Sequence, residues 1–143
     1  MSRPRRLPAA VVILLGLLVG TYCIWAIRTR DGVGVTRADA TPLRLPMGAA
    51  NINYHVAPPA SYYDFDTTEA GFAEFVADWG LPWGEGSGER KATWAWRWDH
   101  TADKRVEVEI ADGTFYGWSK DDAGRYLAFD HRTGRAYCFG SYR

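Results

Sequence analysis

Residues 9–27 read AAVVILLGLLVGTYCIWAI, a run of nineteen positions without a charged side chain. As an α-helix rising about 1.5 Å per residue, this run is roughly 28 Å long, close to the hydrocarbon thickness of a bilayer. A helix satisfies its own backbone hydrogen bonds and can therefore cross lipid unaided. The run predicts a transmembrane helix after a basic N-terminus, residues 1–8, and places the rest of the chain at or across a membrane.

Arginines flank this run and predict its orientation. Arg3, Arg5 and Arg6 precede it, and Arg28 and Arg30 follow it. The more positive flank of a span usually stays in the cytoplasm, so we expect a single-pass protein of the cell membrane, with a cytoplasmic N-terminus and an extracytoplasmic domain. The alternative is export after signal cleavage, although the run exceeds the usual signal core of about 7–15 apolar residues.

Two glycines inside the run, Gly16 and Gly20, lie on one helix face. This spacing lets two membrane helices approach closely, which predicts a weak homodimer through the span. The alternative is that glycine is simply common in membrane helices.

Charge is distributed unevenly along the chain. Residues 1–37 carry six arginines and one acid, a net charge of +5, and the rest carries eleven basic and sixteen acidic side chains, a net charge of −5. The basic part suits anionic lipid headgroups, and the mildly acidic part argues against nucleic acid as a partner.

Residues 28–42 are rich in Gly, Asp and Thr and show no apolar period, so they predict a flexible linker. Residues 43–143 then form one extracytoplasmic domain. The chain has 7 Trp, 8 Tyr and 6 Phe, and such large side chains allow a domain of this size to build a core.

Within this domain, the polar-apolar alternation of residues 51–56 predicts a half-buried strand. Residues 66–79 predict a helix that begins with a capping box of Asp66 and Glu69 and ends at Gly80. Its apolar side chains recur every three to four residues and predict a core-facing stripe: Phe72, Phe75, Val76 and Trp79.

The remaining chain predicts strands at residues 92–98, 105–111, 114–118, 125–129 and 135–141. Asp112-Gly113 predicts a two-residue hairpin turn, and residues 130–134 predict a longer one. The expected fold class is α+β, an N-terminal transmembrane helix followed by one helix packed on an antiparallel sheet. With the last hairpin counted as one element, the order is β-α-β-β-β-β, which is similar to a cystatin in element order only.

The Asp112-Gly113 turn predicts a possible binding surface. It sets Glu109 opposite Tyr116 and Glu107 opposite Trp118, on the sheet face away from the helix. Because one helix covers one face, this face is expected to be partly open, where its aromatics could stack on a sugar ring or hold a cationic group. The alternative is ordinary cross-strand packing.

The stripe of Trp94, Trp96 and Trp98 fits two registers. If Trp96 pairs with Val106 the stripe is core, and if it pairs with Glu107 the stripe forms an exposed aromatic-acidic surface. Burial of large aromatic side chains at about 25 cal/mol per Å² favours the core register.

No catalytic or metal motif is present in the sequence. The three histidines, His55, His100 and His131, lie near carboxylates or turns, but no Ser or Cys nucleophile shares a recognisable motif with them. Cys23 and Cys138 give neither a disulfide framework nor a zinc spacing. We therefore expect no enzymatic activity, no cofactor and no metal.

Three segments carry a resemblance to known proteins: L-P-x-x-A-x-N-I-x-Y at residues 45–54, the aromatic-rich helix at 65–79, and FDHRTGRAYCFGSYR at 129–143. Together they resemble a group of small planctomycete proteins with one N-terminal membrane segment or signal and one domain of roughly 100 residues. His131 interrupts the Asp-Arg pair of that group, and Cys138 replaces a second aromatic residue. The resemblance implies this architecture and transfers no catalytic residue.

These observations predict a membrane-anchored, non-enzymatic interaction or envelope protein, with the membrane and another envelope protein as partners. The alternative is an extracytoplasmic small-molecule or glycan binder that uses Tyr116 and Trp118. A remote alternative is a hydrolase built on His100 and nearby aspartates.

Overall fold

The computed structural model describes residues 9–78, 89–91, 93–120 and 123–141. Predictions for residues 1–8, Trp79 and Gly80 lie outside these residues. Two α-helices, a short 3-10 helix and nine strands follow in the order α1 (Ala9–Arg28), β1 (Arg30–Val35), η1 (Ala38–Ala40), β2 (Ala50–Ala57), β3 (Ala60–Asp66), α2 (Glu69–Asp78), β4 (Glu89–Lys91), β5 (Trp94–Asp99), β6 (Lys104–Glu109), β7 (Gly113–Lys120), β8 (Ala123–Asp130) and β9 (Arg135–Ser141).

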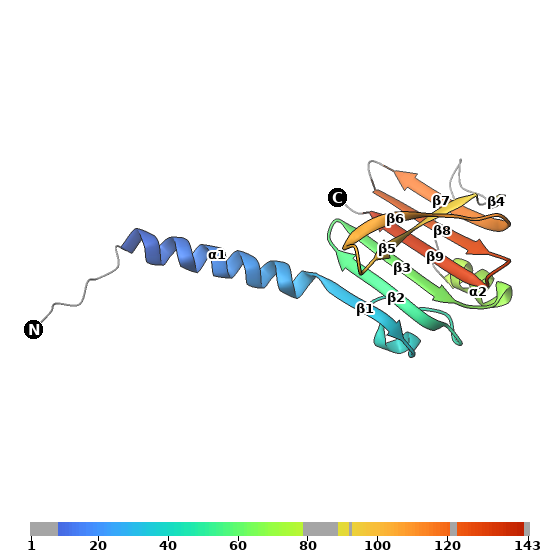
Figure 1. Cartoon of the computed structure of the whole chain (residues 1–143), viewed down its shortest axis with the longest axis horizontal. Helices are drawn as coiled ribbons and strands as arrows, with labels where there is room; N and C mark the ends of the chain where they lie inside the picture. The colour runs from blue at the N-terminus through green and yellow to red at the C-terminus, as the bar shows by residue number, and fades with distance from the viewer. Residues whose placement is uncertain (1–8, 79–88, 92, 121–122, 142–143) are drawn as a thin grey trace, which may run out of the picture.

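Seven strands form one antiparallel sheet in the order β1-β2-β3-β9-β8-β7-β4, and β5 and β6 form a separate hairpin (Figure 1). β9 lies between β3 and β8, so that Cys138 pairs with Tyr63 on one side and Leu127 on the other. The α+β class with an antiparallel sheet is therefore confirmed, but the element order is wrong: three strands, not one, precede α2.

The main core lies between one face of the sheet and α2. Phe65 of β3 meets Phe75 of α2 edge-on, with ring centroids 5.6 Å apart, and Phe72 stacks on Phe129 at 5.2 Å. The helix begins after Thr68, whose Oγ1 accepts a hydrogen bond from the backbone N of Gly71 at 3.0 Å. Thr68 therefore caps the helix in place of Asp66, which ends β3.

The β5–β6 hairpin covers part of the opposite face of the sheet (Figure 1). Ala95 of β5 is buried with Ala128 and Tyr137 of the sheet. The small side chains of Ala95 and Ala128 permit this close approach. The sheet face away from α2 is therefore only partly open, because the hairpin forms a second layer over part of it.

The Asp112-Gly113 pair does not connect two paired strands. β6 pairs with β5, and β7 begins at Gly113 and pairs with β8 and β4, so the chain crosses here from the hairpin to the large sheet. The backbone N of His131 donates to the carbonyl of Asp112 at 2.9 Å, which fixes this crossing. Packing of the hairpin onto the sheet thus outweighs the local turn preference.

The favoured register of the tryptophan stripe is wrong. Trp94 pairs with Glu109 and Trp96 with Glu107, as in the second register considered. The stripe is nevertheless only partly exposed, because the hairpin leans on the sheet. Trp96 meets Tyr126 and Phe139 edge-on, at 5.8 and 5.0 Å.

The N-terminal expectations need two corrections. Among the described residues, no helix is long and apolar enough to cross a membrane. The predicted transmembrane helix is therefore corrected: residues 9–28 form an α-helix, α1, which is not identified as a membrane span. Residues 28–42 are also not a plain linker, since they contain β1 and η1, and β1 pairs with β2.

Candidate functional site

The hairpin leaves a cleft on its own side of the sheet. The hairpin covers the aromatic part of this sheet face and leaves the polar part beside it uncovered. The cleft has a volume of about 660 Å³. Its floor consists of Asp64, Arg135 and Tyr137 of the sheet, and its wall of Arg97, Asp99, Val106, Glu107 and Val108 of the hairpin.

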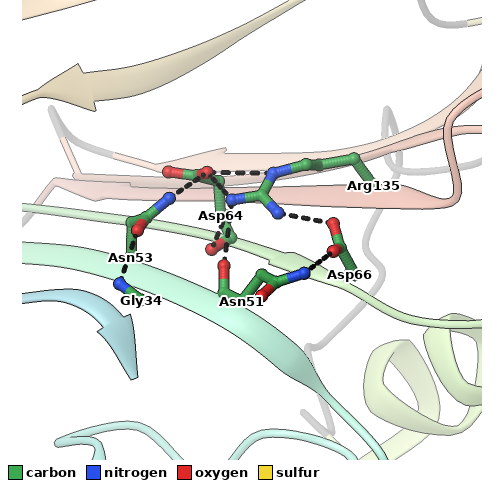
Figure 2. Close-up of polar contacts among 6 residues, drawn as sticks. All are labelled: Gly34, Asn51, Asn53, Asp64, Asp66 and Arg135. Carbon is green, nitrogen blue, oxygen red and sulfur yellow. Dashed lines mark hydrogen bonds and ion pairs between the residues drawn. The ribbon is translucent and has the colours of Figure 1, made fainter. Parts of the chain in front are cut away.

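Arg135 organises the floor of the cleft (Figure 2). Its Nε donates to Asp64 Oδ2 at 3.0 Å, its Nη1 to Asp66 Oδ1 at 2.5 Å, and its Nη2 to the carbonyl of Asn51 at 3.1 Å. Asn53 Nδ2 also donates to Asp64 Oδ2, at 3.0 Å. Asp64 is only 3% exposed, so these bonds compensate the cost of burying its charge.

The charges of this network are stabilised in place. Burial alone would lower the pKa of Arg135, but hydrogen bonds and charges from Asp64 and Asp66 raise it above its ordinary value. Burial alone would raise the pKa of Asp66, but hydrogen bonds from Asn51 and Arg135 lower it. The network therefore serves as a hydrogen-bonded floor in which a partly buried ion pair is supported by additional hydrogen bonds.

Two side chains of the cleft, one from its wall and one from its floor, lie outside this hydrogen-bonded network. Arg97 and Tyr137 both line it, and neither side chain makes a hydrogen bond or ion pair with a residue that the structure describes. Burial raises the pKa of the Tyr137 hydroxyl, which therefore remains a proton donor at neutral pH. The cleft thus combines a hydrogen-bonded floor and an exposed carboxylate, Glu107, with two donors that make no hydrogen bond to a described residue.

Asp99, at the end of the wall, is also satisfied. Its Oδ1 accepts hydrogen bonds from the backbone N of Thr101 at 2.9 Å and of Ala102 at 3.1 Å, and these bonds lower its pKa. Asp99 therefore caps the turn that joins β5 to β6.

The histidines have structural surroundings. His55 Nδ1 lies 2.5 Å from Asp31 Oδ1, and the buried Nε2 of His100 has no hydrogen-bond partner among the described atoms. Among the described residues, neither histidine makes a hydrogen bond to a Ser or Cys side chain. The structure therefore places no Ser or Cys nucleophile in hydrogen-bond contact with His100 among the described residues.

His131 lies between a hydroxyl and a carboxylate. Its Nε2 is 3.0 Å from Thr114 Oγ1, and its Nδ1 is 3.7 Å from Glu69 Oε1. The second distance is too long for a hydrogen bond, and the Glu69 side chain is 78% exposed. These three side chains connect β7 and the β8–β9 turn to the first turn of α2, and His131 does not line the cleft beside the hairpin.

The predicted binding surface is not assembled. Glu107 and Glu109 lie on β6 beside the tryptophans, whereas Tyr116 and Trp118 lie on β7, opposite Leu127 and Arg125 of β8. The ring of Tyr116 packs near that of Phe72 on the α2 side of the sheet, with centroids 6.0 Å apart.

The predicted dimer face remains open in this single chain. A Cβ built on Gly16 or Gly20 would meet no atom within 4 Å.

The sequence did not single out Arg97, Tyr137, Asp64 or Arg135. Their signal was the placement of polar residues at alternate strand positions, as in Asp64 and Asp66 or Arg135 and Tyr137. Such alternation normally indicates a solvated face, and only the hairpin turns this face into a cleft.

No cluster of potential metal ligands occurs among the residues that the structure describes. Comparison of the chain with protein-family models, curated proteins and solved structures finds no match.

Proposed function

We propose that this chain is a non-enzymatic binding protein whose ligand occupies the cleft between the β5–β6 hairpin and the sheet. The observation that carries the proposal is the pair of donors, Arg97 and Tyr137, that face this cleft without a described partner. The volume of about 660 Å³ lies within the range of roughly 300–1,000 Å³ that is common for ligand sites.

A fragment screen by ligand-observed NMR tests this proposal. Val106→Trp places a large side chain on the wall of the cleft, and we expect it to abolish the binding of most fragment hits. Val33→Trp, at an exposed position of β1, is the matched control and should leave the hits unchanged. Hits that persist in Val106→Trp would place the binding site elsewhere and contradict the proposal.

A glycan binder is the second candidate, supported by the exposure of Trp94. This side chain is 38% exposed, pairs across the hairpin with Glu109, and lies 4.6 Å from the ring of Trp96. An exposed indole beside a carboxylate can stack on a sugar ring while the carboxylate accepts its hydroxyl hydrogens. Oligosaccharides should then quench tryptophan fluorescence in the wild type but not in Trp94→Ala.

We further propose that the domain acts outside the cytoplasm, together with a partner from the envelope. The apolar residues 9–27 and the preceding arginines support export of the residues that follow. A reporter that works only in the cytoplasm, fused after residue 143, should be inactive. Activity of that reporter would contradict export.

A further inference from the structure

The geometry points to a specific ligand chemistry for the cleft: we propose that it binds a carboxylate attached to an apolar group. Arg97 and Tyr137 supply the donors, and Val106 and Val108 supply the apolar wall. This inference rests on the proposed function, because it requires that the cleft be the binding site.

The guanidinium of Arg97 lines the cleft and makes no hydrogen bond or ion pair with a described residue, so it is available to a ligand. Arg97 lies in β5 between two tryptophans of the stripe, but it faces the other side of the strand, opposite Val106. Its side chain is half-buried, and its charge lies close enough to Tyr137 and Asp99 to lower the pKa of each. A partly buried guanidinium that makes no hydrogen bond with a described residue is costly to maintain, and a ligand anion would reduce that cost.

Two of the three acids of the cleft are held in hydrogen bonds, and the third, Glu107, is exposed to solvent. Asp64 accepts from Arg135 and Asn53, and Asp99 accepts from two backbone N–H groups of its own turn. Arg97 and Tyr137 keep donor capacity on the half-buried and buried part of the lining, where a ligand that presents acceptors would satisfy it. The planar fork of arginine matches the two oxygens of a carboxylate.

The charge balance of the cleft argues against a polyanion. Arg97 and Arg135 carry two positive charges, and Asp64, Asp99 and Glu107 carry three negative charges, which leaves −1. This field disfavours any anion, and it disfavours a doubly charged phosphate ester more than a single carboxylate, which gains its binding from the local guanidinium. The valines beside it then favour an aliphatic body next to the carboxylate.

The test is an NMR titration of the full-length chain, kept in solution with a neutral detergent, using three probes. Hexanoate carries the carboxylate and an apolar body, hexanamide has the same shape without the charge, and inorganic phosphate has the charge without the apolar body. We expect hexanoate to shift the Arg97 Nε–Hε signal and to bind at least tenfold more tightly than either of the others.

Variants then locate the effect. Arg97→Gln should weaken hexanoate binding at least tenfold, and Tyr137→Phe, which removes only a hydroxyl, should weaken it by about three- to tenfold. Arg132→Gln removes an exposed arginine from the β8–β9 turn and should change nothing. If Arg97→Gln does not fold, the comparison of hexanoate with hexanamide on the wild type decides the question alone.

The outcomes separate the two proposals. Equal binding of hexanoate and hexanamide, or tighter binding of phosphate, would overturn the carboxylate inference. If the fragment hits are nevertheless lost in Val106→Trp, the cleft remains the binding site. If no probe or fragment depends on the cleft, both proposals are wrong.

Discussion

The imidazole of His55 stacks on the indole of Trp98, with ring centroids 3.8 Å apart and ring planes 4° from parallel. His55 belongs to β2 and also contacts Asp31 of β1, whereas Trp98 belongs to the hairpin. Tyr62 of β3 adds a third ring, 5.5 Å from the indole. This cluster therefore joins the hairpin to the β1 side of the sheet.

Removal of the indole should loosen the hairpin. Trp98 is half-buried, so Trp98→Ala should lower the free energy of unfolding by about 2–4 kcal/mol, slightly less than for a fully buried tryptophan. Urea unfolding followed by circular dichroism measures this loss. Trp94→Ala is the control, and its loss should stay below about 1.5 kcal/mol because Trp94 is more exposed. Equal losses would show that the stack with His55 contributes nothing.

Loss of the guanidinium of Arg135 should leave Asp64 as an unpaired buried carboxylate. We expect Arg135→Leu to cost about 3–5 kcal/mol in unfolding free energy. In the double variant Arg135→Leu/Asp64→Leu much of this loss should be recovered, because no buried charge is left alone. A double variant as unstable as the single one would mean that the packing of the arginine, and not its charge, stabilises the floor.

The burial of the Cys138 thiol predicts that the free energy of unfolding decreases in alkaline solution. Its thiol is buried, and burial raises its pKa above the ordinary value. The folded state therefore holds the thiol proton more tightly than the unfolded state does. The resulting contribution to the free energy of unfolding is complete below the unfolded pKa of about 8.5 and is lost as pH rises above that value.

Urea unfolding between pH 7 and pH 10 measures this loss. Other groups also titrate there, so the comparison is with Cys138→Ala, which should lose less stability over the same interval. Identical slopes for the two proteins would show that the thiol ionises equally in both states.

The extent of the folded domain predicts how it tolerates truncation. Because β1 pairs with β2 and Asp31 contacts His55, a fragment of residues 29–143 should unfold cooperatively. A fragment of residues 41–143, which follows the sequence-based boundary, lacks β1 and should have a lower midpoint of thermal unfolding. Equal midpoints would mean that β1 contributes no stability to the sheet.

Local patterns predicted the local elements well. The strand at residues 135–141 and the turn before it have the expected bounds, because Gly134 adopts a φ of 68° that glycine tolerates and its N–H bonds to the carbonyl of Asp130. The helix and the strand at 51–56 were likewise identified from periodicity that lies within the segment itself.

Long-range relationships were not predicted. Asp112-Gly113 indicates only that the chain bends, and it does not say which strand pairs with β6. That choice depends on Ala95 packing against Ala128 and Tyr137, more than thirty residues further along the chain. The cleft was missed for the same reason, since Arg97 and Tyr137 become neighbours only after the hairpin is placed.

The central position of β9 has a consequence for how the chain acquires its structure during synthesis. β9 is the last described strand to leave the ribosome, yet it pairs with both β3 and β8. Until it arrives, β1–β3 and the later strands cannot join into one sheet, and the edge of β3 stays exposed. The pairing of Tyr63 with Cys138 closes a long loop, so folding should be slow compared with a sheet of sequential hairpins, and the nascent chain should be vulnerable to aggregation until β9 has emerged.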